Sequence, residues 1–169
     1  MSAARPLVLA LGNILMQDEG LGVHALNRLT QRYHFPDDLP LLDGGTLGLA
    51  LLPYVADSTD LLIIDCVDNR QAAGTLVRLE GSDVPAALAL KMSVHQVGLQ
   101  DLLAASRLQG TLPQRLVLWG IQPASVDWGL ELSPTVASSI DELIRAVVQE
   151  LRGWGVGVKP AQGEVKDTF

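Results

Sequence analysis

The chain has 169 residues, of which 48% are hydrophobic, and this length fits one domain that buries about 70% of its unfolded surface. Its formal charge of −7 excludes binding to nucleic-acid backbones, which depends on clustered Lys and Arg, and its single cysteine, Cys66, excludes an internal disulfide and a multi-cysteine metal cage. No apolar run approaches the roughly 18 residues of a spanning helix, and the N-terminus lacks the pattern of a secretory signal, so we expect a cytoplasmic protein that does not associate with membranes.

The first predicted element is a strand at residues 6–11. Its nearly continuous apolar run is typical of a strand buried on both faces of a parallel sheet. A helix is predicted from residue 20 to about residue 32. The loop between them leaves the carboxyl end of the strand and carries two neighbouring acids, Asp18 and Glu19. Ligands bind at that edge of open α/β sheets, so this loop is the first candidate for the functional site.

Three more strands and one helix are predicted before residue 80. Residues 39–42 predict a short strand that ends on Asp43-Gly44-Gly45-Thr46, and a helix is predicted from residue 48 to about residue 55. Residues 61–64 predict the clearest buried strand, which ends on Asp65. Residues 74–79 alternate between apolar and polar, as in an edge strand with one face in water. This strand starts too soon after its predecessor for a helical crossover, which favours an antiparallel neighbour.

The second half of the chain adds two helices and one strand. A helix begins at Val94-His95 and stops at Gly110, a strand follows at residues 115–121, and a long loop at residues 122–132 contains Trp128. Ser133 as N-cap and Pro134 as first helical residue predict the start of the last helix, which ends at Gly153.

This alternation of strands and helices predicts one α/β domain over residues 1–154. The fold class is a single three-layer sandwich: a five-stranded, mostly parallel twisted sheet with helices on both faces and one antiparallel edge strand. Residues 155–169 are polar and without pattern, and we expect them to form a disordered tail.

Acidic residues follow three strands that we expect to be neighbours. Asp18 and Glu19 follow the first strand, Asp43 the second and Asp65 the third, and His95 begins a helix that can lean over the same edge. Two carboxylates and one imidazole around an open position suit a borderline divalent metal such as zinc or nickel.

Each of these residues also has a structural interpretation. Asp18 or Glu19 favours a helix N-terminus through the macrodipole, and Asp43 before two glycines is a common turn former. Asp65 is equally compatible with a loop cap, and His95 with a core histidine whose hydrogen bonds are satisfied.

Other chemistries lack their sequence patterns. Ser93 lies near His95 but without the G-x-S-x-G turn that exposes a nucleophile. Gly12 stands without the G-x-G-x-x-G pattern, so no dinucleotide cofactor is predicted. Cys66 is interpreted as a small buried hydrophobe. His24 shares a helix face with polar residues, and we expect it at the surface.

Five segments carry a family resemblance over about residues 6–151. In chain order they are Gly12-Asn13-Ile14-Leu15-Met16-Gln17-Asp18-Glu19-Gly20-Leu21-Gly22, Asp43-Gly44-Gly45-Thr46, Leu62-Ile63-Ile64-Asp65, Ser93-Val94-His95-Gln96 and Leu132-Ser133-Pro134. Together they resemble the maturation endopeptidases of nickel–iron hydrogenases, and most closely the branch that serves membrane-bound uptake hydrogenases.

The resemblance implies an endopeptidase that removes a short C-terminal extension from a hydrogenase large-subunit precursor after nickel insertion. By motif the metal ligands fall on Glu19, Asp65 and His95, and this assignment chooses Glu19 over Asp18. We expect the metal to be nickel that the precursor itself supplies. Asp43-Gly44-Gly45-Thr46 is implied in substrate recognition. The residue that moves the proton is not identified, with Asp43, Glu19 and Asp65 as candidates. We expect a monomer when the protein is free.

The long loop at residues 122–132 suggests how a folded precursor is held. An aromatic side chain such as Trp128 is a natural anchor for a transient interface, although it is equally able to pack the loop onto its own body. Two other functions stay open: a non-catalytic nickel-sensing assembly chaperone that uses the same three residues, and an ordinary metallohydrolase of small molecules with the same fold.

Overall fold

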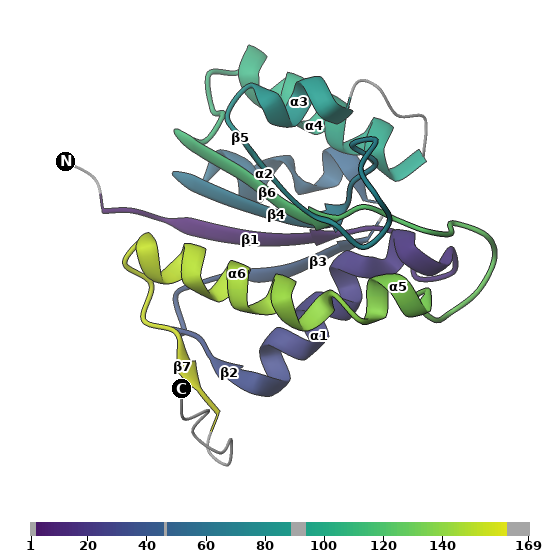
Figure 1. The fold of residues 1–169 in the computed structure, drawn as a ribbon. Helices are drawn as coiled ribbons and strands as arrows, with labels where there is room; N and C mark the ends of the chain where they lie inside the picture. The colour runs from purple at the N-terminus through teal and green to yellow at the C-terminus, as the bar shows by residue number, and fades with distance from the viewer. Residues whose placement is uncertain (1–2, 46, 89–93, 162–169) are drawn as a thin grey trace.

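A five-stranded sheet forms the middle layer of the protein (Figure 1). The computed structural model describes the backbone of residues 3–45, 47–88 and 94–161, and the side chains of all of these except residues 88 and 94–97. In spatial order the strands are β3 (Leu41–Gly45), β1 (Pro6–Leu11), β4 (Asp60–Cys66), β6 (Arg115–Ile121) and β5 (Leu76–Glu80). The first four are parallel, and β5 pairs with β6 in the antiparallel direction, so the predicted fold class is confirmed.

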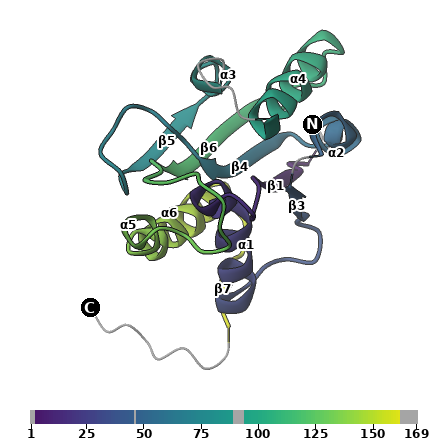
Figure 2. The same cartoon turned by 90° about the vertical axis from the view of Figure 1, so that its right-hand side faces the viewer.

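Helices cover both faces of the sheet (Figures 1 and 2). On one face lie α1 (Leu21–Arg32) and α6 (Ile140–Gly153), and on the other α2 (Leu52–Ala56), α3 (Asp83–Leu88) and α4 (Val94–Leu108). Alternate residues of the central strands supply the two cores: Val8 and Leu62 pack in the core with α1 and α6, and Leu9 and Ile63 in the core with α2 and α4. Because both faces are buried, these strands have continuous apolar runs in the sequence.

The edge strand β5 is antiparallel, as predicted, but it does not pair with the strand that precedes it. β6 lies between β4 and β5, so the short connection from β4 passes the end of β6. Within the described part of the chain, no helix is both long enough and apolar enough to cross a membrane.

The predicted last helix is interrupted. Its start is confirmed, since the side chain of Ser133 accepts a hydrogen bond from the Val136 N–H at 3.3 Å. However, the helix divides into α5 (Pro134–Ala137) and α6, which begins only at Ile140. The Ser138 hydroxyl donates to the carbonyl of Thr135 at 2.7 Å, and such local serine bonds compete with helix continuation.

The predicted disorder from residue 155 onward is wrong for residues 155–161. A two-residue strand, β7 (Lys159–Pro160), pairs antiparallel with β2 (Tyr33–His34), and the side chain of Val158 is 5% exposed. The Arg152 guanidinium donates to the carbonyl of Val158. These segments are too short to show a period in the sequence, so tertiary packing decides their structure. The domain therefore extends past the predicted boundary at 154, and residues 162–169 lie outside the described part of the chain.

Candidate active site

The predicted neighbours do meet at the carboxyl edge of the sheet. β1 lies between β3 and β4, with Ala10 opposite Asp43 on one side and Ile64 on the other. Asp65 follows Ile64 directly, so the acids after these strands lie along one edge. Figure 2 is viewed from this edge, towards which β1 runs in Figure 1.

Gly12 lets the first loop fold back over the strand ends. Its φ angle of +130° favours glycine, and a Cβ atom there would overlap the carbonyl oxygen of Glu19 and lie 3.5 Å from Asp65 Oδ1. That carbonyl also accepts a hydrogen bond from the Asn13 N–H at 3.2 Å. The backbone of Glu19, in the short 3₁₀ helix η1 (Gln17–Gly20), is thereby brought beside the carboxylate of Asp65.

Asp65 is a fully buried acid at the end of a core strand. Its side chain is 0% exposed, and Oδ1 accepts a hydrogen bond from the Cys66 N–H at 2.8 Å. Both Asp65 and Glu19 take part in further polar or electrostatic interactions. A carboxylate is buried at this depth only when hydrogen bonds, a proton or a cation stabilise it. Cys66 itself is buried in the core beside α1 and α6, as expected of a small hydrophobe.

Asp18 has a different role from its neighbour Glu19. Its side chain is 0% exposed and accepts hydrogen bonds from the backbone N–H groups of Ala124, Ser125 and Ser133 and from the Ser133 hydroxyl. Glu19 is partly exposed. The hypothesis that Asp18 serves the helix N-terminus is therefore wrong. With its carboxylate engaged by these donors, the geometry leaves Glu19 as the acid of the pair that is accessible from solvent.

Asp43 forms a turn at the end of β3. Its exposed carboxylate accepts a hydrogen bond from the Gly45 N–H at 3.0 Å, and Gly45 has a φ angle of +47°. The turn-forming interpretation is confirmed, and the role of Asp43, Gly44 and Gly45 in substrate recognition stays a prediction. Thr46 lies outside the described residues.

His95 is the second residue of α4, and its side chain lies outside the described part of the structure. The start of α4 is nevertheless placed. Gly98 packs so closely against Gly48 of the 3₁₀ helix η2 (Gly48–Leu51) that a Cβ on either would lie 3.2 Å from the other's Cα. The first turns of α4 thus contact the segment that follows β3. Among the described side chains no group of three His, Cys, Asp or Glu is arranged to hold a metal, and this finding does not cover a trio that includes His95.

Comparison with known proteins gives the family. A family model described as hydrogenase maturation protease matches residues 23–150. The chain belongs to the hydrogenase maturation protease family. It is 46% identical over 156 residues to the hydrogenase expression/formation protein HupD of Rhodobacter capsulatus, covering 91% of this chain and 74% of that protein. It is 42% identical over 159 residues to the hydrogenase 2 maturation protease of Escherichia coli, covering 94% and 97%.

Solved structures agree with this family. The hydrogenase maturating endopeptidase HybD from Escherichia coli superposes with a TM-score of 0.90 at 40% identity, covering 95% of this chain and 99% of that one. A solution structure of an endopeptidase from the same organism gives a TM-score of 0.88 at 40% identity, covering 95% and 99%. The chain is accordingly a protease, and the sheet edge described above is the candidate active site of a hydrogenase maturation protease.

The loop from β6 to α5 lies on the first loop of this protease. The Gln17 N–H donates to the Gly129 carbonyl, and the Gly129 N–H donates to the Leu15 carbonyl, both at 2.9 Å. Trp128, which precedes Gly129, is 78% exposed, so the hypothesis that it packs the loop onto the body is wrong. Exposed apolar side chains follow β1, β3 and β6 at this edge, and we call them the apolar rim: Ile14, Leu15, Leu47, Leu49, Val126, Trp128 and Leu130.

Two polar residues, Gln122 and His24, are placed differently from what the sequence indicated. Gln122 is 7% exposed and joins the loop after β6 to the loop after β4: its Oε1 accepts from the N–H groups of Asn69 and Gln71, and its Nε2 donates to Asp68. A glutamine directly after an apolar strand was the available signal. His24, predicted at the surface, is only partly exposed, and its Nε2 is buried without a hydrogen-bond partner among the described residues.

Proposed function

We propose that this protease removes the C-terminal extension of a nickel–iron hydrogenase large-subunit precursor after nickel has been inserted. The observation that carries the proposal is that the fold-back at Gly12 brings the Glu19 backbone beside the Asp65 carboxylate, at the sheet edge that also bears the apolar rim. Relatives named for hydrogenase maturation, one of them the hydrogenase 2 maturation protease, support the same substrate class.

In the proposed reaction Glu19, Asp65 and His95 bind the nickel that the precursor carries. A metal held by these residues would supply a Lewis acid able to polarise the scissile carbonyl or to position the attacking water. Asp65 supplies a carboxylate whose direction is held by the Cys66 N–H, and partly exposed Glu19 supplies one that the precursor can reach. Because three protein ligands form an incomplete set, the protease becomes competent only when a loaded precursor completes it.

The proton-transfer step is assigned to an exposed carboxylate rather than a buried one. Asp65 is 0% exposed, whereas Asp43 is exposed at the end of β3, on the other side of β1. A general base has to reach the water that it activates, so Asp43 and Glu19 are the better candidates for this role.

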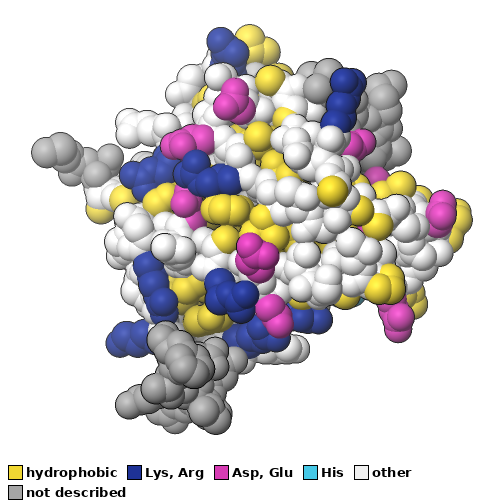
Figure 3. All heavy atoms as spheres, viewed as in Figure 1, with side chains coloured by type: hydrophobic (Ala, Val, Ile, Leu, Met, Phe, Trp, Pro, Cys, Tyr) yellow, Lys and Arg dark blue, Asp and Glu magenta, His cyan; other side chains and the backbone are white. Residues whose placement is uncertain are grey.

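The apolar rim is the proposed docking surface for the folded precursor. Figure 3 shows hydrophobic and acidic side chains together at the right-hand end of the molecule, where the loop from β6 to α5 lies in Figure 1. Trp128 is the natural anchor, since aromatic residues dominate the energetics of many interfaces. A rim of exposed side chains suits a protein substrate better than a small molecule, which pockets bury on most sides.

Mass spectrometry of the nickel-loaded large-subunit precursor, incubated with and without the protein, tests the proposal. A precursor shortened at its C-terminus is the expected result. A precursor that binds the protein but keeps its full mass would instead favour the nickel-sensing chaperone, and a precursor that neither binds nor changes mass would reject the substrate class.

A further inference from the structure

We infer that Asp18 is a positioning residue, which fixes the docking loop at residues 122–133 to the loop that carries Glu19. Its role in the reaction rests on the proposed function, whereas its effect on the loop does not. Asp18 neighbours Glu19 in η1, and its hydrogen-bond partners lie more than a hundred residues further along the chain, at separations of 106, 107 and 115 residues.

The carboxylate holds both ends of the docking loop. At the start of the loop, Oδ2 accepts from the N–H groups of Ala124 and Ser125, both at 2.9 Å. At its end, Oδ1 accepts from the Ser133 N–H and Oδ2 from the Ser133 hydroxyl, both at 2.8 Å. The Asp18 N–H in turn donates to the Ser125 carbonyl at 3.1 Å. A carboxylate suits this position because all its lone pairs accept and it has no proton to oppose the donors.

The segment between these anchor points is held at one further place, by the backbone of Gly129. Val126, Trp128 and Leu130 are 42%, 78% and 65% exposed, so their side chains contribute little to the core. The backbone of Gly129 contacts only the first loop among the hydrogen bonds described for it. Asp18 therefore holds the two ends of the segment that carries the most exposed part of the apolar rim, while Gly129 holds its middle. In Figure 2 this loop, in green, passes beside the purple start of α1.

Asp18→Asn tests the role with almost no change in shape. The amide replaces one acceptor oxygen by an NH₂ donor, which must face either the Ser133 N–H or the N–H groups of Ala124 and Ser125. Opposed buried donors are unfavourable, so the loop loses at least one anchor. Ser133→Ala is the milder variant, since it removes only the hydroxyl donor to Asp18 and the cap on Val136.

The first readout is a double-mutant cycle on precursor processing, with Asp18→Asn, Trp128→Ala and the double variant. Asp18→Asn is expected to raise KM for the nickel-loaded precursor about tenfold and to change kcat by less than about threefold, because residues in one network couple strongly. If Asp18 acts through the position of Trp128, the same substitution in the Trp128→Ala background changes KM by less than about twofold. Equal factors in both backgrounds, or an effect on kcat alone, would overturn the inference.

The second readout needs no substrate and stays valid if the proposed function fails. Amide hydrogen exchange of residues 124–133 is expected to accelerate at least about tenfold in Asp18→Asn, with the amides of β4 unchanged. Asp141→Asn on α6 is the matched control, because it removes the same charge from a side chain whose hydrogen bonds go to α1 and not to the loop, and it leaves that exchange as in the wild type. Should Asp18→Asn not fold, Ser133→Ala gives the same pattern at smaller amplitude. Unchanged exchange at residues 124–133 in a folded variant would contradict the positioning role of Asp18. Failure of the wild-type protein to shorten the precursor would contradict only the proposed function.

Discussion

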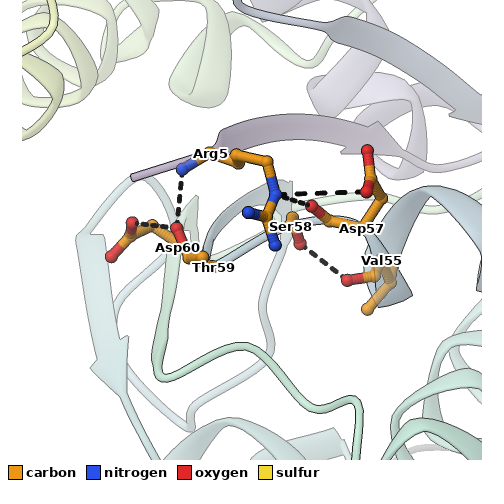
Figure 4. A network of polar contacts seen from close by, with 6 residues as sticks. All are labelled: Arg5, Val55, Asp57, Ser58, Thr59 and Asp60. Atoms are coloured by element: carbon orange, nitrogen blue, oxygen red, sulfur yellow. Dashed lines mark hydrogen bonds and ion pairs between the residues drawn. The ribbon is translucent and has the colours of Figure 1, made fainter. Parts of the chain in front are cut away.

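The two edges of the central sheet both carry acids, but they stabilise them in different ways. At the amino edge Arg5 contacts the carboxylate of Asp57 (Figure 4), and Arg115 contacts that of Asp60. Asp57 is 88% exposed and the two arginines about half, whereas Asp60 is 15% exposed. At the carboxyl edge Asp18 and Asp65 are 0% exposed and accept hydrogen bonds from backbone N–H groups.

The acids of the two edges therefore differ in what their presence costs the protein and in what their removal should do. Exposed ion pairs contribute about 0–1 kcal/mol each, so the amino edge tolerates the loss of one. A buried carboxylate has lost its hydration, which costs free energy. When it is removed, each buried N–H or O–H donor left without an acceptor lowers the free energy of unfolding by about 1–3 kcal/mol. Acids are retained under such cost where they hold a geometry, as Asp18 does, or where they do chemistry, as proposed for Asp65.

The sharpest test of this comparison removes one acid from each edge. Glu19→Ala is expected to reduce precursor processing at least about a hundredfold, because a proposed ligand of the catalytic metal is lost. Its melting temperature should stay within about 2 °C of the wild type, since Glu19 is partly exposed. Asp65→Asn and His95→Ala should also stop processing.

The control at the amino edge is Asp57→Asn. Its carboxylate is 88% exposed, so both processing rate and melting temperature should match the wild type. Equal losses from Glu19→Ala and Asp57→Asn would remove the distinction between the edges.

A second variant tests how closely the carboxyl edge is built. Gly12→Ala is expected to lower the free energy of unfolding by about 2–4 kcal/mol, because its methyl group would overlap the Glu19 carbonyl and its φ angle is +130°. Urea denaturation measures the loss. Gly153→Ala at the end of α6 is the matched control, since a Cβ there has nothing within 4 Å, and its stability should be unchanged or slightly raised. A Gly12→Ala protein as stable as Gly153→Ala would mean that the fold-back is not needed.

Particular residues show which features of the structure can be predicted from the sequence. Apolar runs such as residues 61–64 predict buried parallel strands because both faces of β4 are covered, and the acids follow from where such strands end. The division of roles between Asp18 and Glu19 was not readable, because it depends on donors more than a hundred residues away. The β2–β7 pair and the break at Ser138 depend on tertiary contacts and local side-chain bonds, which leave no period in the sequence.

A smaller effect is expected from the apolar rim. Trp128→Ala should raise KM for the precursor about ten- to thirtyfold with kcat nearly unchanged, as for an interface anchor. Its melting temperature should not move, because the side chain is 78% exposed. Leu108→Ala is the control: Leu108 is 89% exposed, at the end of α4 that leads to the opposite edge, and its loss should leave KM as it is. A drop of several degrees in Trp128→Ala with normal KM would identify Trp128 as a packing residue.

The smallest effect is expected from an ion pair between α1 and α6. Partial burial acts to raise the pKa of Asp141, but the hydrogen bond and charge of Arg32 and the charge of Arg28 outweigh it and lower the pKa below its ordinary value. A pKa lowered on folding adds stability above the unfolded value, and this is lost as pH falls through the folded one. The wild type should therefore exceed Asp141→Asn by less than about 1 kcal/mol at pH 7, since the pair is half-exposed. Thermal unfolding should show the difference shrink as pH falls below about 3.8, the ordinary pKa of the carboxyl. A difference that grows as pH falls would mean that Asp141 does not gain its stability as a carboxylate.

The central claim is that residues at the carboxyl edge recognise the nickel carried by the precursor, so that cleavage depends on it. The most direct measurement compares cleavage of nickel-loaded and nickel-free precursor by the wild-type protein, side by side, with the mass of the product as readout. We predict that only the loaded precursor is shortened, and that Glu19→Ala shortens neither. Cleavage of both forms at similar rates by the wild type would contradict the claim and would leave Glu19 and Asp65 as residues of a protease that does not sense its substrate's metal.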